Sequence, residues 1–540
     1  MLYGPSVPSQ CVTVTVPAPS VRAMVAKIRP AAHGITRKTW ANLFSRFRAE
    51  LRLADVIDPN WQGCAARDPA WAPLVQAIAG DKRLSTGLAV FYNWCAARGI
   101  RPEEAKAAFE EFGAWLDERS LCPRPRDVLR RIPQLWNEAS EKIEAWPKAK
   151  LTLISFKAPP KRHQWCDLSE SLWRETEAYC AMRENPDPFD ERPNAPTRLA
   201  ASTLRQQRVH LRLAASILIE SGVPAEEIAS LADLVQPERF KTVLRHYHQR
   251  ANEQPNAFVV GLAKTLIQVA YHHVGASPEE VAQLKRIASK LPSIPFELTP
   301  KNNALLRQFE SDRLKAELLF LPEKLIADVT KSLETGRVDF VKAQVAVAID
   351  FQLVVPLRPQ NLSRLNWQRH FIEPDGPRGR LLLHIPKAEM KSGKQDFNAE
   401  IPDHVARRLR WYRRHILPRL NAAVNGDLFV TRKGVRKDQK TITIQITRAI
   451  EDHLGVYMTV HQFRHLAGSS YLEDNPEDME TPRALLGHAW SKTTRIYVGS
   501  SSRRASRAYN RFVFEKREAL RLKRKRQRTR KPKGSPPCAS

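Results

Sequence analysis

Apolar residues recur at intervals of three and four along most of the chain, which predicts a protein built mainly of α-helices. Residues 39–57 place apolar side chains on one helical face and basic side chains on the other. Residues 84–119 predict two helices, with Gly99 ending the first and Pro102 opening the second. Similar runs predict further helices over 167–184, 203–235, 256–274, 302–321, 322–336 and 442–455.

The pattern departs from helix in the last third of the chain. Residues 380–402 read as two short strands around a turn at Ser392-Gly393, and residues 426–434 as a short strand and turn. Before them, residues 338–367 predict an apolar helix, a break at Pro356 and a second helix opening near Pro359. We therefore expect a mainly α fold with a small β-hairpin or sheet in the C-terminal domain.

Proline-rich breaks divide the pattern into segments. A connection at 147–163, a break near Asn185 and a linker at 290–300 separate the helical groups. The first 30 residues, rich in Pro, Ser and Val, predict a mobile tail. The expected organisation is a tail over 1–30, helical domains over 31–150 and 165–292, a domain over 318–515 and a basic tail over 516–540.

Two observations on the helical domains leave alternatives open. In both domains, an apolar helix is followed by a glycine turn and by a second helix that begins with Pro and Glu. This similarity fits either an internal duplication or a chance likeness of two helical hairpins. The first domain holds seven tryptophans, expected to be core rather than base-stacking: Trp40, Trp61, Trp71, Trp94, Trp115, Trp136 and Trp146.

The charge balance indicates a polyanionic partner. The 540 residues carry a formal net charge of +30, which favours nucleic acid over an acidic membrane surface. There is no apolar run long enough for a membrane span and no secretory signal pattern. The seven cysteines are scattered without C-x-x-C spacing, which predicts free thiols and no zinc site. We expect a cytoplasmic, nucleoid-associated protein.

Residues 461–497 concentrate the groups suited to phosphate chemistry. They read HQFRHLAGSSYLEDNPEDMETPRALLGHAWSKTTRIY. On a helix, His461 and Arg464 share a face, and Gly487 would break the next helix just before His488. Arginine clamps phosphate oxygens, histidine moves protons near neutral pH, and a tyrosine such as Tyr497 can attack as a nucleophile. His465 is expected to be structural.

This ordered set, H-x-x-R, then L-G-H, then T-T-x-x-Y, resembles the tyrosine recombinase (phage integrase) family; the alternative is a chance cluster of solvated side chains. The resemblance implies that Tyr497 is the nucleophile, with Tyr471 and Tyr509 as alternatives if the register differs. It also implies a helical core-binding domain, which residues 165–292 resemble in position and helix pattern.

Two further site residues follow from the same resemblance. Arg358, in V-P-L-R-P-Q-N-L, lies where the family has its first arginine, although Val355-Pro356 replaces Thr-Gly and Asn361 replaces the usual Glu. A surface helix cap is the alternative for Arg358. Lys391, in K-S-G-K, matches the family's hairpin lysine, with Lys387 and Lys394 as alternatives.

The resemblance implies DNA cleavage and rejoining through a 3′-phosphotyrosyl link, with Arg358, Lys391, His461, Arg464, His488 and Tyr497 as the catalytic set and no metal or cofactor. The implied partners are double-stranded DNA, a homo-tetramer on DNA and accessory DNA-bending proteins. The length of the N-terminal half favours a mobile-element enzyme. A type IB topoisomerase and a non-catalytic DNA-binding protein remain alternatives.

The basic C-terminal region extends this expectation. It should begin as a helix reaching about Arg526, and a segment here can pack on a neighbouring protomer, as in several members of the family. Residues 523–533 are a dense cationic run, which predicts a phosphate-binding arm, or alternatively a solvated tail without function.

Overall fold

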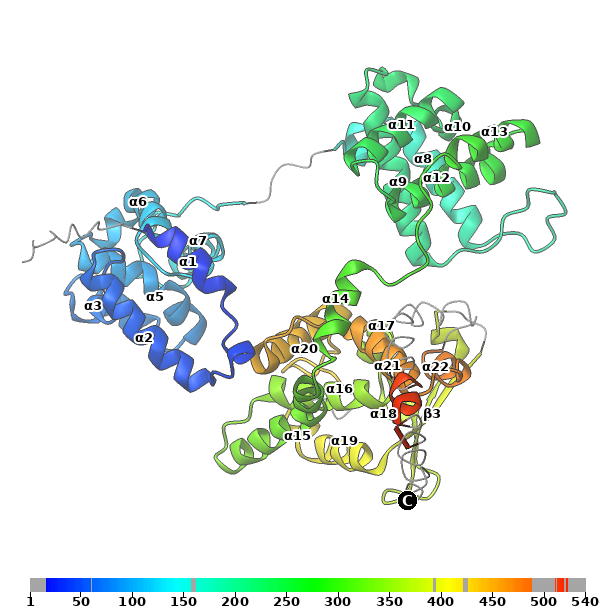
Figure 1. Ribbon diagram of the computed structural model, residues 1–540. Coiled ribbons are helices and arrows are strands. Elements are labelled where there is room, and N and C mark those ends of the chain that lie inside the picture. Colours follow the sequence, from blue (N-terminus) through cyan, green and yellow to red (C-terminus); the bar gives the residue numbers. More distant parts are fainter. Residues whose placement is uncertain are drawn as a thin grey trace, which may run out of the picture. The chain divides into compact units, whose positions relative to one another are not determined.

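The computed structural model describes residues 16–59, 61–156, 162–391, 395–420, 426–487, 510, 512–518, 521 and 522. The chain divides into two compact units, one made of residues 1–152 and 297–540 and the other of residues 153–296. Within the described residues the secondary structure is almost all helix, with one three-stranded sheet (Figure 1). The expectation of a mainly α fold with a small sheet is confirmed. Among the described helices, none is both long and apolar enough to cross a membrane.

The N-terminal helical part belongs to the first unit. Its helices are α1 (Ala18–Lys27), η1 (Pro30–His33), α2 (Arg37–Leu53), α3 (Cys64–Arg67), α4 (Ala72–Ala77), α5 (Lys82–Ala97), η2 (Pro102–Glu104), α6 (Ala105–Glu118) and α7 (Pro125–Lys142). As expected, α5 stops just before Gly99, whose φ of +68° suits glycine, and Pro102 opens the next element.

An aromatic core holds these helices together. Phe91 of α5 meets Phe112 of α6 and Trp136 of α7, with ring centroids 4.9 and 5.7 Å apart. Trp71, Trp94, Trp136 and Trp146 are fully buried, as predicted. The other three tryptophans, Trp40, Trp61 and Trp115, are only partly buried, so they are less buried than predicted.

The first 30 residues are not simply a mobile tail, because α1 forms part of the folded body. Pro17 precedes the helix, and its side chains Ala18 and Val21 are buried. Arg22 donates to the carbonyl of Leu116 on α6 at 3.3 Å. The apolar residues of this ten-residue helix do not follow a clear helical period, and only two of them are buried, so the helix depends on packing against α6.

The second unit is a helical bundle with its own core. It contains η3 (Trp165–Asp167), α8 (Glu170–Glu184), α9 (Ala201–Glu220), η4 (Ala225–Glu227), α10 (Leu231–Val235), α11 (Pro237–Arg250), α12 (Ala257–Val269), the π-helical turn η5 (Ala270–Val274) and α13 (Pro278–Ala288). Residues 203–235 were predicted as two helices of one hairpin. The second is only the five-residue α10, because Pro237 starts a new helix, α11, directly after it.

The C-terminal domain surrounds α16, a helix whose residues from Ala343 to Gln352 are all buried. Its elements are α14 (Pro300–Gln308), α15 (Asp312–Glu334), α16 (Phe340–Val354), α17 (Pro359–Ser363), α18 (Trp367–His370), β1 (Phe371–Ile372), β2 (Leu381–Ile385), η6 (Lys387–Glu389), β3 (Phe397–Ile401), α19 (Asp403–His415), η7 (Leu417–Leu420), α20 (Gln439–Leu454), α21 (Val460–Asp474) and α22 (Glu480–Leu485).

The predicted hairpin is present as β2 and β3, which pair antiparallel from Leu381↔Ile401 to Ile385↔Phe397. The two-residue strand β1 adds to β2 and completes the order β1-β2-β3. The turn Ser392-Gly393 lies outside the described residues. Residues 426–434, predicted to hold a short strand, form only isolated bridges, Asn366↔Asp427 and Val430↔Arg436.

Two boundaries differ from the sequence prediction. The helices expected to separate at Pro322 are one helix, α15, which continues through that proline. The domain core also begins earlier than residue 318, since Leu305 of α14 and Phe309 are buried in it. Proline marks a helix break in sequence, but Pro322 and its neighbour Leu321 are buried in α15, which packs against α16 and continues through the proline.

Candidate active site

The helix α21 carries His461 and Arg464 and begins at a capping box. Thr459 is the N-cap, and its backbone N–H donates to Oε1 of Gln462 at 2.8 Å. From this start, His461 lies one residue into the helix and remains exposed, whereas Arg464, one turn later, is 4% exposed. The two side chains therefore share a helical face at different depths, as their spacing predicted.

Arg464 joins three segments of the domain. Its Nη1 donates to the carbonyl of Pro356 at 2.8 Å, and its Nη2 donates to the carbonyl of Leu486. Pro356 lies in the break between α16 and α17, and Leu486 directly follows α22. The guanidinium thus holds the start of the L-G-H segment against the turn that presents Arg358. In Figure 1, α17, α21 and α22 lie close together.

Arg358 occupies the N-cap position of α17 and is half-buried. Pro359 at the first helical position fixes the helix start, as the sequence predicted. Asn361 is buried in α17 and donates from Nδ2 to the carbonyl of Glu389 at 3.0 Å. The amide therefore ties the arginine-bearing turn to the segment between β2 and β3.

That segment carries Lys391. Its last helical residue, Glu389, pairs through its carboxylate with Arg369 and lies 3.3 Å from Nε2 of His370. Met390 packs against Gly487, where an added methyl group would lie 3.2 Å from Met390 Cε. These contacts hold the residues directly before the exposed Lys391. Of the two alternatives, Lys387 lies in η6, four residues before Lys391, and Lys394 is outside the described residues.

The electrostatics of His461 indicate how these residues converge. Partial desolvation lowers the pKa of His461, and the positive charges of Arg464, Arg358 and Lys391 lower it further. Three cations from α21, the α17 turn and the β2–β3 loop therefore act on one imidazole. Such a concentration of positive charge is suited to a bound phosphate.

His465 has the structural environment expected of it. Its side chain is 7% exposed, and burial, then the charges of His461 and Arg464, lower its pKa to about 4. The rings of His461 and His465 are perpendicular, with centroids 5.0 Å apart.

The last two predicted site residues, His488 and Tyr497, lie outside the described residues. The chain leading to them is described as far as Gly487, whose φ of +56° ends the turn after α22, as predicted. The hydroxyl of Tyr471 donates to Oδ2 of Asp478 at 2.7 Å, and Tyr509 is outside the described residues.

Two residues next to the site gave no signal in the sequence. Glu389 supports the Lys391 loop, and Asn302 of α14 bonds to Gln462 and His465 of α21. Each acts through contacts with residues distant in the chain, and neither belongs to a recurring motif.

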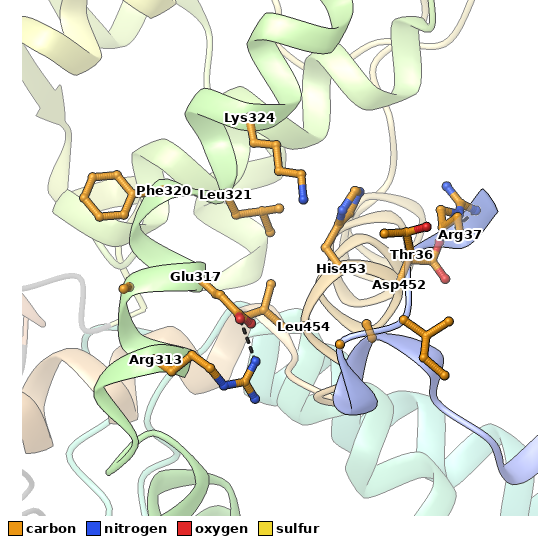
Figure 2. Close-up of a pocket in the computed structure, with 14 residues that line it drawn as sticks. Thr36, Arg37, Arg313, Glu317, Phe320, Leu321, Lys324, Asp452, His453 and Leu454 are labelled. Atoms are coloured by element: carbon orange, nitrogen blue, oxygen red, sulfur yellow. Dashed lines mark hydrogen bonds and ion pairs between the residues drawn. The ribbon is translucent and has the colours of Figure 1, made fainter. Parts of the chain in front are cut away.

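A cavity defined by the described residues lies away from these side chains. It measures about 560 Å³ and is lined by the segment around Thr36 together with α15 and the end of α20 (Figure 2). Ion pairs fix this segment on α20: Arg29 with Glu451 at 2.6 Å and Arg37 with Asp452 at 3.4 Å. The cavity contains none of the predicted site residues.

Comparisons with known proteins find similarity in the C-terminal domain. The phage integrase family model matches residues 321–504. Over 182 residues the chain is 30% identical to the tyrosine recombinase XerC of Pseudomonas fluorescens, which covers 33% of this chain and 56% of that protein. Over 71 residues it is 38% identical to XerC of Pseudomonas savastanoi pv. phaseolicola, covering 13% and 23% respectively.

Among solved structures, XerA recombinase matches 64% of this chain and 98% of that chain at 16% identity, with a TM-score of 0.29. The chain spans about half the length of the first XerC and about a quarter of the second. The family model covers the segments that carry Arg358, Lys391, His461 and Arg464. Residues 321–504 of this chain are therefore similar to the phage integrase family and to the tyrosine recombinase XerC.

Proposed function

We propose that the chain is a site-specific DNA recombinase that cuts and rejoins DNA through a covalent 3′-phosphotyrosyl intermediate, in the service of a mobile element. One observation carries the proposal: the guanidinium of Arg464 bonds to the carbonyls of Pro356 and Leu486, and it thereby joins the H-x-x-R helix to the turn of Arg358 and to the L-G-H segment. These segments lie in the region that the phage integrase family model matches. The net charge of +30 supports DNA as the partner.

In the proposed reaction, the hydroxyl oxygen of Tyr497 attacks the phosphorus of a DNA phosphodiester. The bond from phosphorus to the 5′ oxygen breaks, and a phosphotyrosyl link forms on the 3′ side. Because the new ester conserves the bond, the reverse attack by a 5′ hydroxyl rejoins DNA without ATP. His461 and His488 orient the phosphate and accept or return the tyrosine proton.

The cations have two separate tasks. Arg358 and Arg464 neutralise the non-bridging oxygens as negative charge develops in the transition state. Arg464 suits this task because its two carbonyl contacts hold the guanidinium in place before DNA binds. Lys391 protonates the departing 5′ oxygen, so that the leaving group is an alcohol rather than an alkoxide.

Recombination requires two duplexes and four strand cuts, so the proposed assembly is a homo-tetramer on DNA, with accessory DNA-bending proteins as further partners. We propose that the helical unit of residues 153–296 acts as the core-binding domain and that residues 523–533 contact phosphates. The proposed location is the nucleoid.

The proposal is tested with a suicide substrate, a DNA fragment from the flanks of the gene that is nicked near the cut so that rejoining fails. A recombinase gives an SDS-resistant adduct on the 3′ side of the break and joins strands from two different DNA molecules. A type IB topoisomerase gives the adduct and relaxes supercoils without such exchange. DNA binding with no adduct favours a non-catalytic DNA-binding protein.

A further inference from the structure

A chain of side-chain amides connects the start of α21 to His465. The backbone N–H of Thr459, which can only donate, bonds to Oε1 of Gln462 at 2.8 Å. The amide nitrogen of Gln462 therefore points away from the cap. It donates to Oδ1 of Asn302, on α14, at 3.1 Å.

The direction of the hydrogen bond between Asn302 and His465 follows in the same way. Because Oδ1 of Asn302 accepts from Gln462, its Nδ2 faces the ring of His465, 3.1 Å from Nε2. An amide nitrogen only donates, so Nε2 accepts and the proton of the neutral ring lies on Nδ1. The backbone N–H of Thr459 thus sets the donor and acceptor of all three hydrogen bonds, and the last of them selects one tautomer of His465.

The selected tautomer matters because His465 stands beside His461. Their ring centroids are 5.0 Å apart in an edge-to-face arrangement, and His465 is 7% exposed. A second positive charge there would add to those of Arg464, Arg358 and Lys391, which already act on His461. Within the part of the chain that the structure describes, His461 and Arg464, both on α21, act on His465, and α14 presents the neutral amide of Asn302.

We propose that Asn302 is a positioning residue for His461. It holds His465 as the neutral Nδ1–H tautomer and thereby sets the orientation of the His461 ring beside the phosphate. The role rests on the proposed function, although the tautomer can be measured without it. Asn302 is well placed for this task, because α14 is anchored in the domain core by Leu305 and capped by Thr299.

The test replaces Asn302 with a group of equal size and opposite hydrogen-bonding character. In Asn302→Asp, one oxygen still accepts from Gln462, and the other faces Nε2 of His465, which must now carry a proton. A nearby carboxylate raises a histidine pKa by about 1–3 units. The control is Asn303→Asp, on the neighbouring exposed asparagine, whose Nδ2 donates to the carbonyl of Leu298 at 3.1 Å. Asn302→Leu removes both side-chain bonds.

The first readout is the nitrogen NMR signal of the His465 ring in the full-length protein, assigned by its loss in a His465→Gln variant. Wild type and Asn303→Asp should show the Nδ1–H tautomer with no titration between pH 5 and 8. Asn302→Asp should show Nε2 protonated and a raised pKa, and Asn302→Leu a mixture of tautomers. An unchanged His465 signal in both Asn302 variants would overturn the inference, whatever the activity.

The second readout is single-turnover cleavage of the suicide substrate as a function of pH. Asn302→Asp should cut at least about 10-fold more slowly than wild type, since small displacements of catalytic groups are costly. It should also gain an acid-side inflection where His465 becomes charged, which Asn303→Asp lacks. Shifted NMR signals with a wild-type cleavage profile would overturn the positioning role. Shifted signals with no cleavage by wild type would instead overturn the proposed function.

Discussion

Replacing Arg464 with lysine separates the charge of this residue from its geometry. The guanidinium is 4% exposed and donates to two carbonyls from different segments, those of Pro356 and Leu486. Lysine keeps the positive charge, but its single ammonium cannot reproduce the fork that spans both acceptors. We therefore expect Arg464→Lys to leave one buried carbonyl without its donor.

The expected cost follows from that lost bond. A hydrogen bond from a charged group contributes about 1.5–3 kcal/mol, so the segment after α22 should open roughly 10- to 150-fold more often. Because Leu486 directly precedes the L-G-H glycine, the effect should be local. For cleavage, removal of one preorganised donor at a developing charge costs about 10²–10³ in rate.

Two assays measure these effects separately. Native-state hydrogen exchange reports the opening of α21 and α22 in the full-length chain, where a single unfolding transition is not expected. Single-turnover cleavage of the suicide substrate reports catalysis. The control is Arg380→Lys, an exposed arginine paired with Asp375 at 2.9 Å, which should leave both the exchange of α21 and α22 and the cleavage rate at wild-type values. Wild-type protection of α22 together with cleavage within about 3-fold of wild type would refute the reasoning.

Three further predictions concern the same domain. Arg408→Met should destabilise the C-terminal domain by about 3–5 kcal/mol, because it leaves the buried Asp350 carboxylate, which Arg408 binds at 2.6 and 2.8 Å, without its partner. Adding Asp350→Leu should recover most of the loss, measured in the thermal transition of that domain. Folding lowers the pKa of His465 from 6.5 to about 4, so the unfolded chain binds the proton more readily and stability falls as pH drops from 6.5 toward 4. This amounts to about 2 kcal/mol at pH 5, and a denaturation series in which His465→Gln keeps the full acid-side slope would contradict it. Gly455→Ala should release the segment of residues 29–37 and speed its proteolysis, because the new methyl would lie 2.5 Å from a backbone nitrogen there; Gly336→Ala, with the same left-handed backbone but open space around it, should not.

The local structure around much of the candidate site could be predicted, because it depends on residues that are close in sequence. H-x-x-R requires only that 461–464 be helical, and the α17 start at Pro359 is encoded by the proline itself. Gly487 ends the turn before the L-G-H histidine through its own backbone freedom. Such features depend on short-range rules, so the elements that carry Arg358, Lys391, His461 and Arg464 followed from the sequence.

The supporting residues could not be predicted, because they act across long separations. Asn302 meets His465 across 163 positions, and Asn361 bonds to the carbonyl of Glu389 across 28. Neither contact has a periodicity or a spacing that marks it. For the same reason α1 was missed and α15 was divided at Pro322, since tertiary burial outweighs weak local signals in both places.

The most direct test of the account compares wild type with Tyr497→Phe on the nicked suicide substrate. The account predicts an SDS-resistant protein–DNA adduct with wild type and none with the phenylalanine variant, at equal DNA binding. An adduct with both proteins would mean that another tyrosine, such as Tyr471 or Tyr509, attacks the phosphorus. No adduct with either protein, despite tight binding to the DNA, would contradict the claim that this chain cleaves DNA covalently.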